Sequence, residues 1–182
     1  MLLQFYPDMI PLLLLILLPL IEPDQTHLIE WSSARKLTWN DFQGKPNDES
    51  DNAALTSSNI NFQFGYGSAG FNYTISCRFD KNQSWVKVKS DHVLAHEQGH
   101  FDIAEIHARK LNKALKEYKY NRNTVSQDVN KIYEDIMKKH HETQSIYDKE
   151  TDHSRNTAKQ EEWYKKIAND LKALEAYADY KK

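Results

Sequence analysis

The feature that most constrains this chain is a five-residue motif, His96-Glu97-Gln98-Gly99-His100. Residues four apart on an α-helix lie about 40° apart around its axis and one turn apart along it. His96 and His100 would therefore present two imidazole rings on one face, where both can bind a single metal ion. Glu97 would lie at the flank of that face, within reach of a water beside the ion. This is the H-E-x-x-H arrangement of zinc hydrolases.

The residues around the motif predict a long helix. Ser90 and Asp91 are suitable caps, and no proline interrupts the chain from there to about Tyr120. Apolar residues follow at helical spacing. We therefore expect one long helix to carry the motif and to bury an apolar stripe formed by Val93, Leu94, Ile103, Ile106, Leu111 and Leu115.

Length and charge limit the class of protein. The chain has 182 residues, of which 40% are hydrophobic, and this is enough for one sizeable core because single domains mostly have about 100 to 200 residues. Its 24 basic and 26 acidic residues give a net charge of −2 without a long block of one sign. Nucleic-acid binders carry a basic patch or stripe, so we exclude nucleic acid as a partner.

An uncharged apolar run covers residues 10–21. It is shorter than the roughly 20 residues that cross a bilayer and matches the core of a signal peptide. The preceding residues include Asp8 but no Lys or Arg, and no small-x-small cleavage site follows before Glu22. We therefore expect residues 1–25 to be a signal peptide or an uncleaved N-terminal anchor that associates with a membrane. Residues 26–182 would form a single zinc-peptidase-like domain, secreted or periplasmic.

Between about residues 37 and 89 the apolar period changes to that of a strand. Alternating residues at 60–66 and 71–79, with glycines between them, predict a hairpin, and residues 85–88 predict a third strand. The single cysteine, Cys77, lies in the second alternating run and excludes an intramolecular disulfide. We expect it to be a small core residue.

Two further segments complete the predicted fold. A polar stretch at 43–52 separates the sheet from residues 37–42, where Trp39 and Phe42 are expected to cap the core. After the motif helix, apolar stripes predict helices over about 125–145 and 157–177. The predicted fold is α+β and zincin-like: a small antiparallel sheet over about 37–89, followed by three helices with the motif on the first.

A catalytic zinc usually has three protein ligands, so the motif needs a third. His107 lies seven residues after His100, about 10 Å further along an unbroken helix and too far to share the ion. We predict His153, which lies in the polar stretch 147–154 between the second and third helices, where Asp148 or an acidic neighbour would orient a ligating ring. The alternatives are His140, His141 and Glu142 on the second helix.

Several separated motifs together resemble the DUF922 family of secreted bacterial proteins, which are predicted zinc-dependent proteases. The resemblance covers about residues 36–172. It implies that His96 and His100 are metal ligands, that Glu97 is the catalytic residue and that His153 is the distant histidine of the last motif. The motifs that carry it are 96–103 followed by Ala108-Arg109, and the segments 37–46, 54–56 and 147–153.

The motif and the resemblance predict a metallopeptidase with one Zn²⁺ per chain that hydrolyses peptides or proteins. Glu97 would take a proton from a zinc-bound water and pass it to the leaving amine. Tyr147 or His107 would donate to the oxyanion, and a strand at 85–89 would bind an extended peptide by edge pairing. The alternative is a zinc-stabilised envelope interaction module without catalysis, in which replacement of Glu97 changes nothing.

Overall fold

The computed structural model describes residues 25–68 and 70–181. This part of the chain contains small antiparallel sheets and three α-helices, which confirms the predicted α+β fold. Two 3-10 helices, at Trp39–Asp41 and Glu175–Lys181, complete it. The strands and α-helices are β1 (Leu28–Glu30), β2 (Ala54–Leu55), β3 (Ser58–Gly67), β4 (Gly70–Asp80), β5 (Trp85–Val86), α1 (Asp91–Glu117), α2 (Val125–Thr151) and α3 (Thr157–Ala173).

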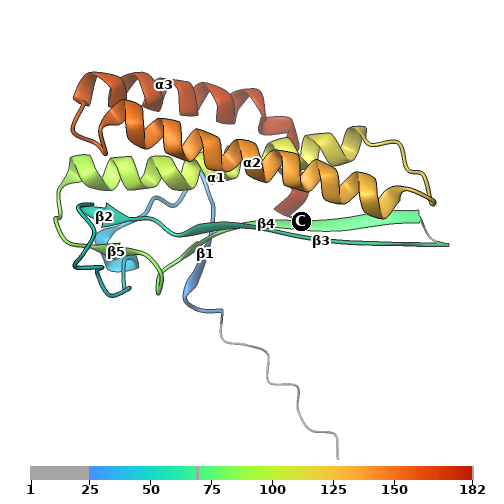
Figure 1. The fold of residues 1–182 in the computed structure, drawn as a ribbon, viewed down its shortest axis with the longest axis horizontal. Coiled ribbons are helices and arrows are strands. Elements are labelled where there is room, and N and C mark those ends of the chain that lie inside the picture. Colours follow the sequence, from blue (N-terminus) through green and yellow to red (C-terminus); the bar gives the residue numbers. More distant parts are fainter. Residues whose placement is uncertain (1–24, 69, 182) are drawn as a thin grey trace, which may run out of the picture.

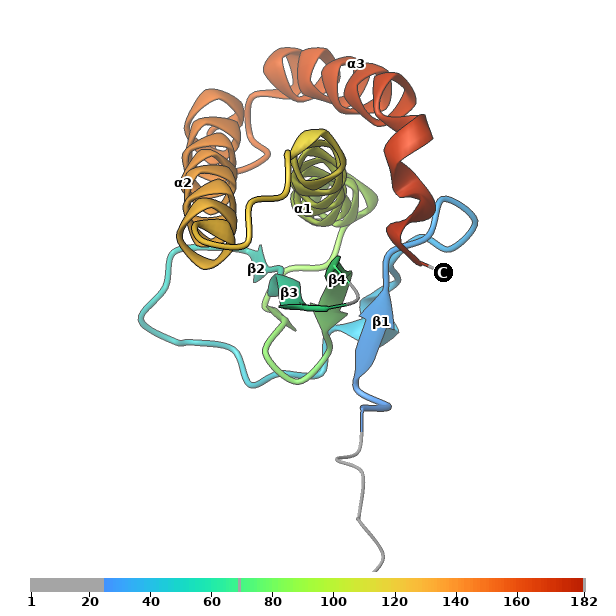
Figure 2. The ribbon, with the colours of Figure 1, turned by 90° about the vertical axis from the view of Figure 1, so that its right-hand side faces the viewer.

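The helices form layers over one face of the main sheet (Figure 1). In this sheet the strand order is β1-β4-β3, and all pairs are antiparallel. Seen along its axis, α1 lies between the sheet on one side and α2 and α3 on the other (Figure 2). The motif helix is therefore enclosed by all the other layers.

Burial of α1 on two sides explains why apolar residues occur around most of its circumference. Toward the sheet, Phe101, Ala104 and Leu111 join the core that contains Cys77 and Phe79. Toward α3, a second cluster holds Ile103, Ile106, Tyr147, Trp163 and Ile167.

The strands differ from the prediction in two respects. The main sheet begins with β1, outside the predicted range of about 37–89, and a strand of three residues is too short to show an alternating pattern. The expected third strand, β5, pairs with β2 in a separate two-stranded sheet. The ladder of the β2–β5 sheet does not continue into the β3–β4 ladder. At Ser57, between β2 and β3, the backbone N–H donates to the Ser84 hydroxyl instead of a backbone carbonyl.

The second helix is longer than predicted. We expected it to end near 145 and residues 147–154 to form a loop, but α2 continues to Thr151. Tyr147 and Thr151 are fully buried, and the Thr151 hydroxyl donates to the Tyr147 carbonyl. Burial of the helix face that carries these two residues stabilises the last turns of α2. Its C-cap is Asp152, the first of three consecutive residues with positive φ (49°, 50° and 76°).

Other predictions have mixed outcomes. Cys77 is fully buried, and Phe42 packs in the core with Trp39 against it, as expected. The third helix ends at Ala173, earlier than expected. The apolar run at 10–21 lies outside the described residues, so its role stays a prediction. Among the residues that are described, no helix is long and apolar enough to span a membrane.

Candidate metal centre

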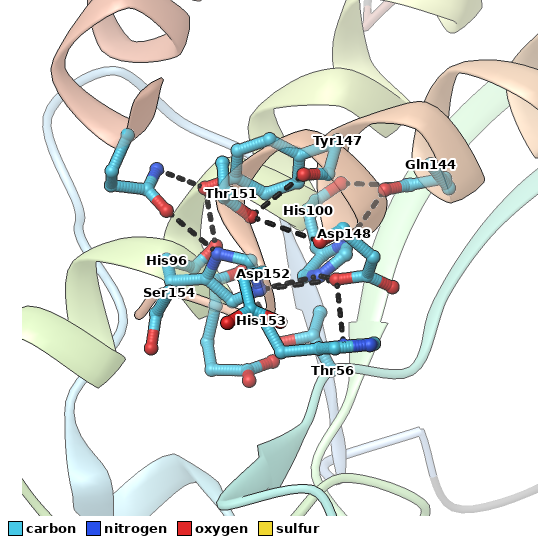
Figure 3. A network of polar contacts seen from close by, with 12 residues as sticks. Thr56, His96, His100, Gln144, Tyr147, Asp148, Thr151, Asp152, His153 and Ser154 are labelled. Atoms are coloured by element: carbon cyan, nitrogen blue, oxygen red, sulfur yellow. Dashed lines mark hydrogen bonds and ion pairs between the residues drawn. The ribbon is translucent and has the colours of Figure 1, made fainter. Parts of the chain in front are cut away.

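The first turns of α1 position the two motif histidines. Ser90 caps the helix, since its hydroxyl accepts a hydrogen bond from the Val93 N–H. His96 and His100 then lie one turn apart, and their Nε2 atoms are 3.1 Å from each other. The rings meet edge to face, with both Nε2 atoms directed toward α2 (Figure 3).

Asp148 on α2 completes a group of three. Its Oδ1 atom is 3.2 Å from His96 Nε2 and 3.0 Å from His100 Nε2. Within residues 25–68 and 70–181, these are the side chains whose ligand atoms lie close enough together to hold a metal ion. A carboxylate from α2 therefore offers a third candidate ligand atom.

Two glutamines fix the protonation of the imidazole rings. His96 Nδ1 is 2.8 Å from Gln160 Oε1, and His100 Nδ1 is 2.6 Å from Gln144 Oε1. Both amides are oriented by their nitrogens: Gln160 donates to the Tyr147 hydroxyl, and Gln144 donates to the His100 carbonyl. Because an amide oxygen only accepts, each Nδ1 carries a proton, so the neutral form of each ring has its lone pair on Nε2.

The Nε2 atoms of the two neutral rings and Asp148 Oδ1 therefore face one another, an arrangement that a cation between them would stabilise. A tetrahedral zinc with Zn–N bonds of 2.0–2.1 Å has edges of about 3.3–3.4 Å between ligands. The separations of 3.0–3.2 Å among His96, His100 and Asp148 are close to that value. Neutral imidazoles with fixed tautomers and a carboxylate are also ligands that Zn²⁺ accepts. The residues present therefore fit the ion.

The electrostatics also favour positive charge at this point. Burial acts to lower the pKa of His100, but the hydrogen bond with Asp148 and the charges of Glu97 and Asp148 outweigh it and raise the pKa. Burial acts to raise the pKa of Asp148, but the contacts with His100 and His96 outweigh it and lower the pKa well below its usual range. A cation beside Asp148 is thus stabilised by its surroundings.

Glu97 places a second carboxylate beside this group. It is only 4% exposed, and its Oε2 atom is buried without a hydrogen-bond partner in the described part of the chain. An unpaired buried carboxylate oxygen is costly, so a water or a substrate proton is expected to bind there. Glu97 lines the same cleft as the two histidines and Asp148.

This cleft, of about 380 Å³, lies between an extended segment and the helices. Residues 52–58 form one wall. The opposite wall comes from α1, α2 and the turn after α2, through Val93, His96, Glu97, His100, His140, His141, Gln144, Asp148, His153 and Ser154.

Comparison with known proteins assigns a family. A family model described as a bacterial protein of unknown function, DUF922, matches residues 29–154. The chain belongs to the DUF922 family. No curated protein and no solved structure matches it significantly. The DUF922 match includes the motif, Asp148 and His153 but ends before Gln160.

Tyr147 of this DUF922 protein lies behind the histidines instead of in the cleft. Its ring stacks on His96, with centroids 4.6 Å apart, and its hydroxyl donates to the His96 carbonyl and accepts from Gln160. It is fully buried, and burial raises its pKa well above the usual range. These contacts occupy the hydroxyl that we expected to stabilise an oxyanion.

His153 lies at the margin of the three-residue group. Its Nδ1 atom is 3.6 Å from Asp148 Oδ1, and its half-exposed ring lines the cleft. The structure thus brings His153 near the candidate ligands, and its assignment as a ligand stays a prediction. It lies on the strained turn after α2, where residues 152–154 have positive φ.

The other histidines occupy different positions. His140 and His141 line the cleft, but His140 Nε2 accepts a hydrogen bond from Gln144. His107 is buried between α1 and α2, where its Nδ1 is 3.0 Å from the Ile103 carbonyl oxygen. Burial lowers the pKa of His107 to about 4. Glu142 is not among the residues that line the cleft.

Asp148 as a candidate ligand and the two glutamines were not predicted from the sequence. Two signals were present. Gln160 lies on the apolar stripe of α3 with Trp163 and Ile167, and a polar residue on such a stripe is usually buried with a partner. Gln144 and Asp148 follow His140 at intervals of four residues, so they share its face if the helix continues.

Proposed function

We propose that this DUF922 protein is a zinc-dependent hydrolase that cleaves peptide bonds. The observation that carries the proposal is the convergence of the Nε2 atoms of two histidines and one carboxylate oxygen within 3.2 Å of each other. His96, His100 and Asp148 would hold the ion. When bound, Zn²⁺ would supply a Lewis acid that polarises the scissile carbonyl.

The residues of the chain supply the proton transfer. The free oxygen of Glu97 accepts a proton from the attacking water and delivers it to the leaving amine, as a general base and then a general acid. Gln144 and Gln160 keep the protons of the two imidazoles at Nδ1. The enclosure of Glu97 within α1, α2 and the wall at 52–58 restricts access of other water.

Activity and zinc content are measured together to test this proposal. Elemental analysis and hydrolysis of fluorescein-labelled β-casein are compared for wild type, Glu97→Gln and the control Glu142→Gln, which removes a carboxylate outside the cleft. We expect about one zinc per chain in all three proteins and a loss of about 10²- to 10⁴-fold in rate only in Glu97→Gln. Zinc retention without hydrolysis in wild type would instead favour the non-catalytic interaction module.

The third ligand is tested separately. Zinc dissociation constants are compared for Asp148→Asn and His153→Gln, because these residues lie 3.6 Å apart at the same end of the group. We expect Asp148→Asn to weaken zinc binding at least tenfold and His153→Gln to weaken it less. The reverse order would assign the third position to His153.

A further inference from the structure

One wall of the cleft is formed by residues 52–58, the segment that contains β2 and leads into β3. All seven residues from Asn52 to Ser58 line it, opposite the motif histidines and Glu97. Figure 2 shows β2, within this segment, below α2 and on the side of the sheet away from β1. Beyond Ser58 the same chain continues as β3, which pairs with β4 on one side only. The cleft is thus bordered by a strand with one unpaired edge.

The hydrogen bonds show which residues of this wall point to the paired edge. The Lys87 N–H donates to the Ala53 carbonyl at 2.7 Å, and the Asp80 N–H donates to the Ser57 carbonyl at 2.9 Å. The Ser57 N–H itself donates to the hydroxyl of Ser84. Odd-numbered residues of the wall therefore direct their polar backbone groups toward β5 and the turn before it.

Even-numbered residues direct theirs to the opposite edge, because successive residues of a strand alternate. They are Asn52, Ala54, Thr56 and Ser58, of which Ala54 and Thr56 lie in the middle of the wall. Within the described part of the chain, the backbone N–H and C=O of Thr56 have no hydrogen-bond partner. The Thr56 side chain is tied to the motif helix, since its hydroxyl donates to the Glu97 carbonyl at 3.2 Å. The unpaired edge consequently runs past the proposed general base.

The charges of the cleft identify the kind of chain that fits. Among the described residues that line it there is no Lys or Arg, so no permanently charged basic side chain is available for a terminal carboxylate. Its carboxylates, Glu97 and Asp148, are the ones that the proposed reaction and metal use. In the described part of the cleft, no Lys, Arg or spare carboxylate is therefore free to pair with the charged ends of a peptide. An internal segment of a polypeptide has no terminal charge and needs no such partner.

We propose that residues 52–58 bind an extended internal segment of a substrate polypeptide as an added strand. The N–H and C=O groups of Ala54 and Thr56 would form the backbone hydrogen bonds, a mode that selects unfolded or loop segments over folded ones. The cleavage of that segment rests on the proposed function, whereas its binding does not. The pairing strand is β2 with its flanks, in place of the predicted strand at 85–89, of which no residue lines the cleft.

Binding is tested without turnover in full-length, zinc-loaded Glu97→Gln protein, with fluorescein-labelled β-casein as the probe. Proline at position 54 removes the N–H that faces the cleft but none of the bonds to β5. We expect Ala54→Pro to weaken binding about three- to tenfold, the effect of one hydrogen bond. The control is Asp51→Pro, at a position just outside the wall. In the described structure the Asp51 N–H donates no hydrogen bond, so this variant should bind casein normally.

Hydrogen exchange gives a second measurement that needs no proline. Saturating β-casein should slow deuterium uptake at the amides of Ala54 and Thr56, with no slowing in the polar loop at 43–50. Absence of casein binding, binding without this protection, or equal binding by Ala54→Pro and Asp51→Pro would overturn the proposed strand pairing. If casein protects these amides in zinc-loaded wild type but is not hydrolysed, the result would contradict the proposed hydrolase activity and leave the proposed strand pairing intact.

Discussion

At the scale of single residues, two carboxamides decide which histidine atoms are free. His96 and His100 could be predicted because their relation is local: four residues on one helix. Gln160 could not, because it is 64 residues from His96 in the sequence and reaches it only after α3 packs on α1. The sequence therefore identifies the two candidate ligands but not the contacts of their Nδ1 atoms.

Loss of one carboxamide should weaken metal binding. Gln160→Met keeps the length of the side chain but removes the acceptor for His96 Nδ1, and partners of this kind typically contribute 10- to 100-fold to metal affinity. We expect the zinc dissociation constant, measured by competition with a chelating dye, to rise by that factor. The exposed Gln63→Met, on the polar face of the sheet, is the control. Equal affinities in the two variants would show that Gln160 does not support the site.

Gly99 is required by Tyr147. A Cβ atom at position 99 would overlap the Tyr147 hydroxyl and lie 2.8 Å from its Cζ, and that ring is fully buried. We expect Gly99→Ala to reduce the free energy of unfolding in urea by about 1 to 3 kcal/mol. Gly67→Ala, where an added Cβ meets nothing within 4 Å, should change it by less than about 0.5 kcal/mol. Equal effects would contradict the close packing of Tyr147 on α1.

At the scale of elements, helix starts were more predictable than helix ends. Ser90 and the apolar stripe indicated where α1 begins, since both signals lie within a few residues. The end of α2 depends on the packing of Tyr147 and Thr151 against other helices, which no local pattern contains. Because residues 147–151 are helical, the Asp148 side chain points toward His96 and His100.

The contact between α1 and α2 should make stability depend on pH. His107 and His140 face each other across it, with ring centroids 5.4 Å apart. Burial lowers the pKa of His107 to about 4 and, together with repulsion from neighbouring histidines, that of His140 to about 3. Both values lie below the ordinary 6.5, so the unfolded chain binds protons first as the pH falls, and stability is lost from about pH 6.5 downward.

This loss is measurable with a matched variant. Between pH 7.5 and 5.5 the two histidines should together reduce the free energy of unfolding by roughly 2 to 3 kcal/mol. Urea unfolding is measured in the presence of EDTA for wild type and for the double variant His107→Leu and His140→Leu. In the variant the histidines of the proposed metal centre still titrate, but residues 107 and 140 do not. An equal change with pH in both proteins would show that the pair is not held neutral.

At the scale of the whole molecule, the proposed ion joins segments that are far apart in the sequence. His96 and Asp148 are separated by 52 residues and belong to different helices. The layers could be predicted in outline from the order of strands and helices, but the two-stranded sheet β2–β5 could not, because strands of two residues carry no period. One strand of that small sheet, β2, lies in the wall opposite the proposed metal centre.

Because zinc would bind the folded chain and not the unfolded one, it should raise the thermal stability of the molecule. At 100 times the dissociation constant the gain is about 2.7 kcal/mol, which for a chain of this size raises Tm by about 5 to 10 °C. Thermal unfolding with zinc and with EDTA measures the difference. Asp148→Asn should show a smaller shift than wild type, and an equal shift would contradict its role as a ligand.

The most direct measurement is a crystal structure of the zinc-loaded protein, with diffraction data collected on both sides of the zinc absorption edge. We predict one anomalous peak, at about 2.0–2.2 Å from His96 Nε2, His100 Nε2 and a carboxylate oxygen of Asp148. The Nδ1 atoms of both histidines should keep their contacts with Gln160 and Gln144. A zinc-loaded crystal without a peak between α1 and α2, or with the peak at other residues, would contradict the proposed centre.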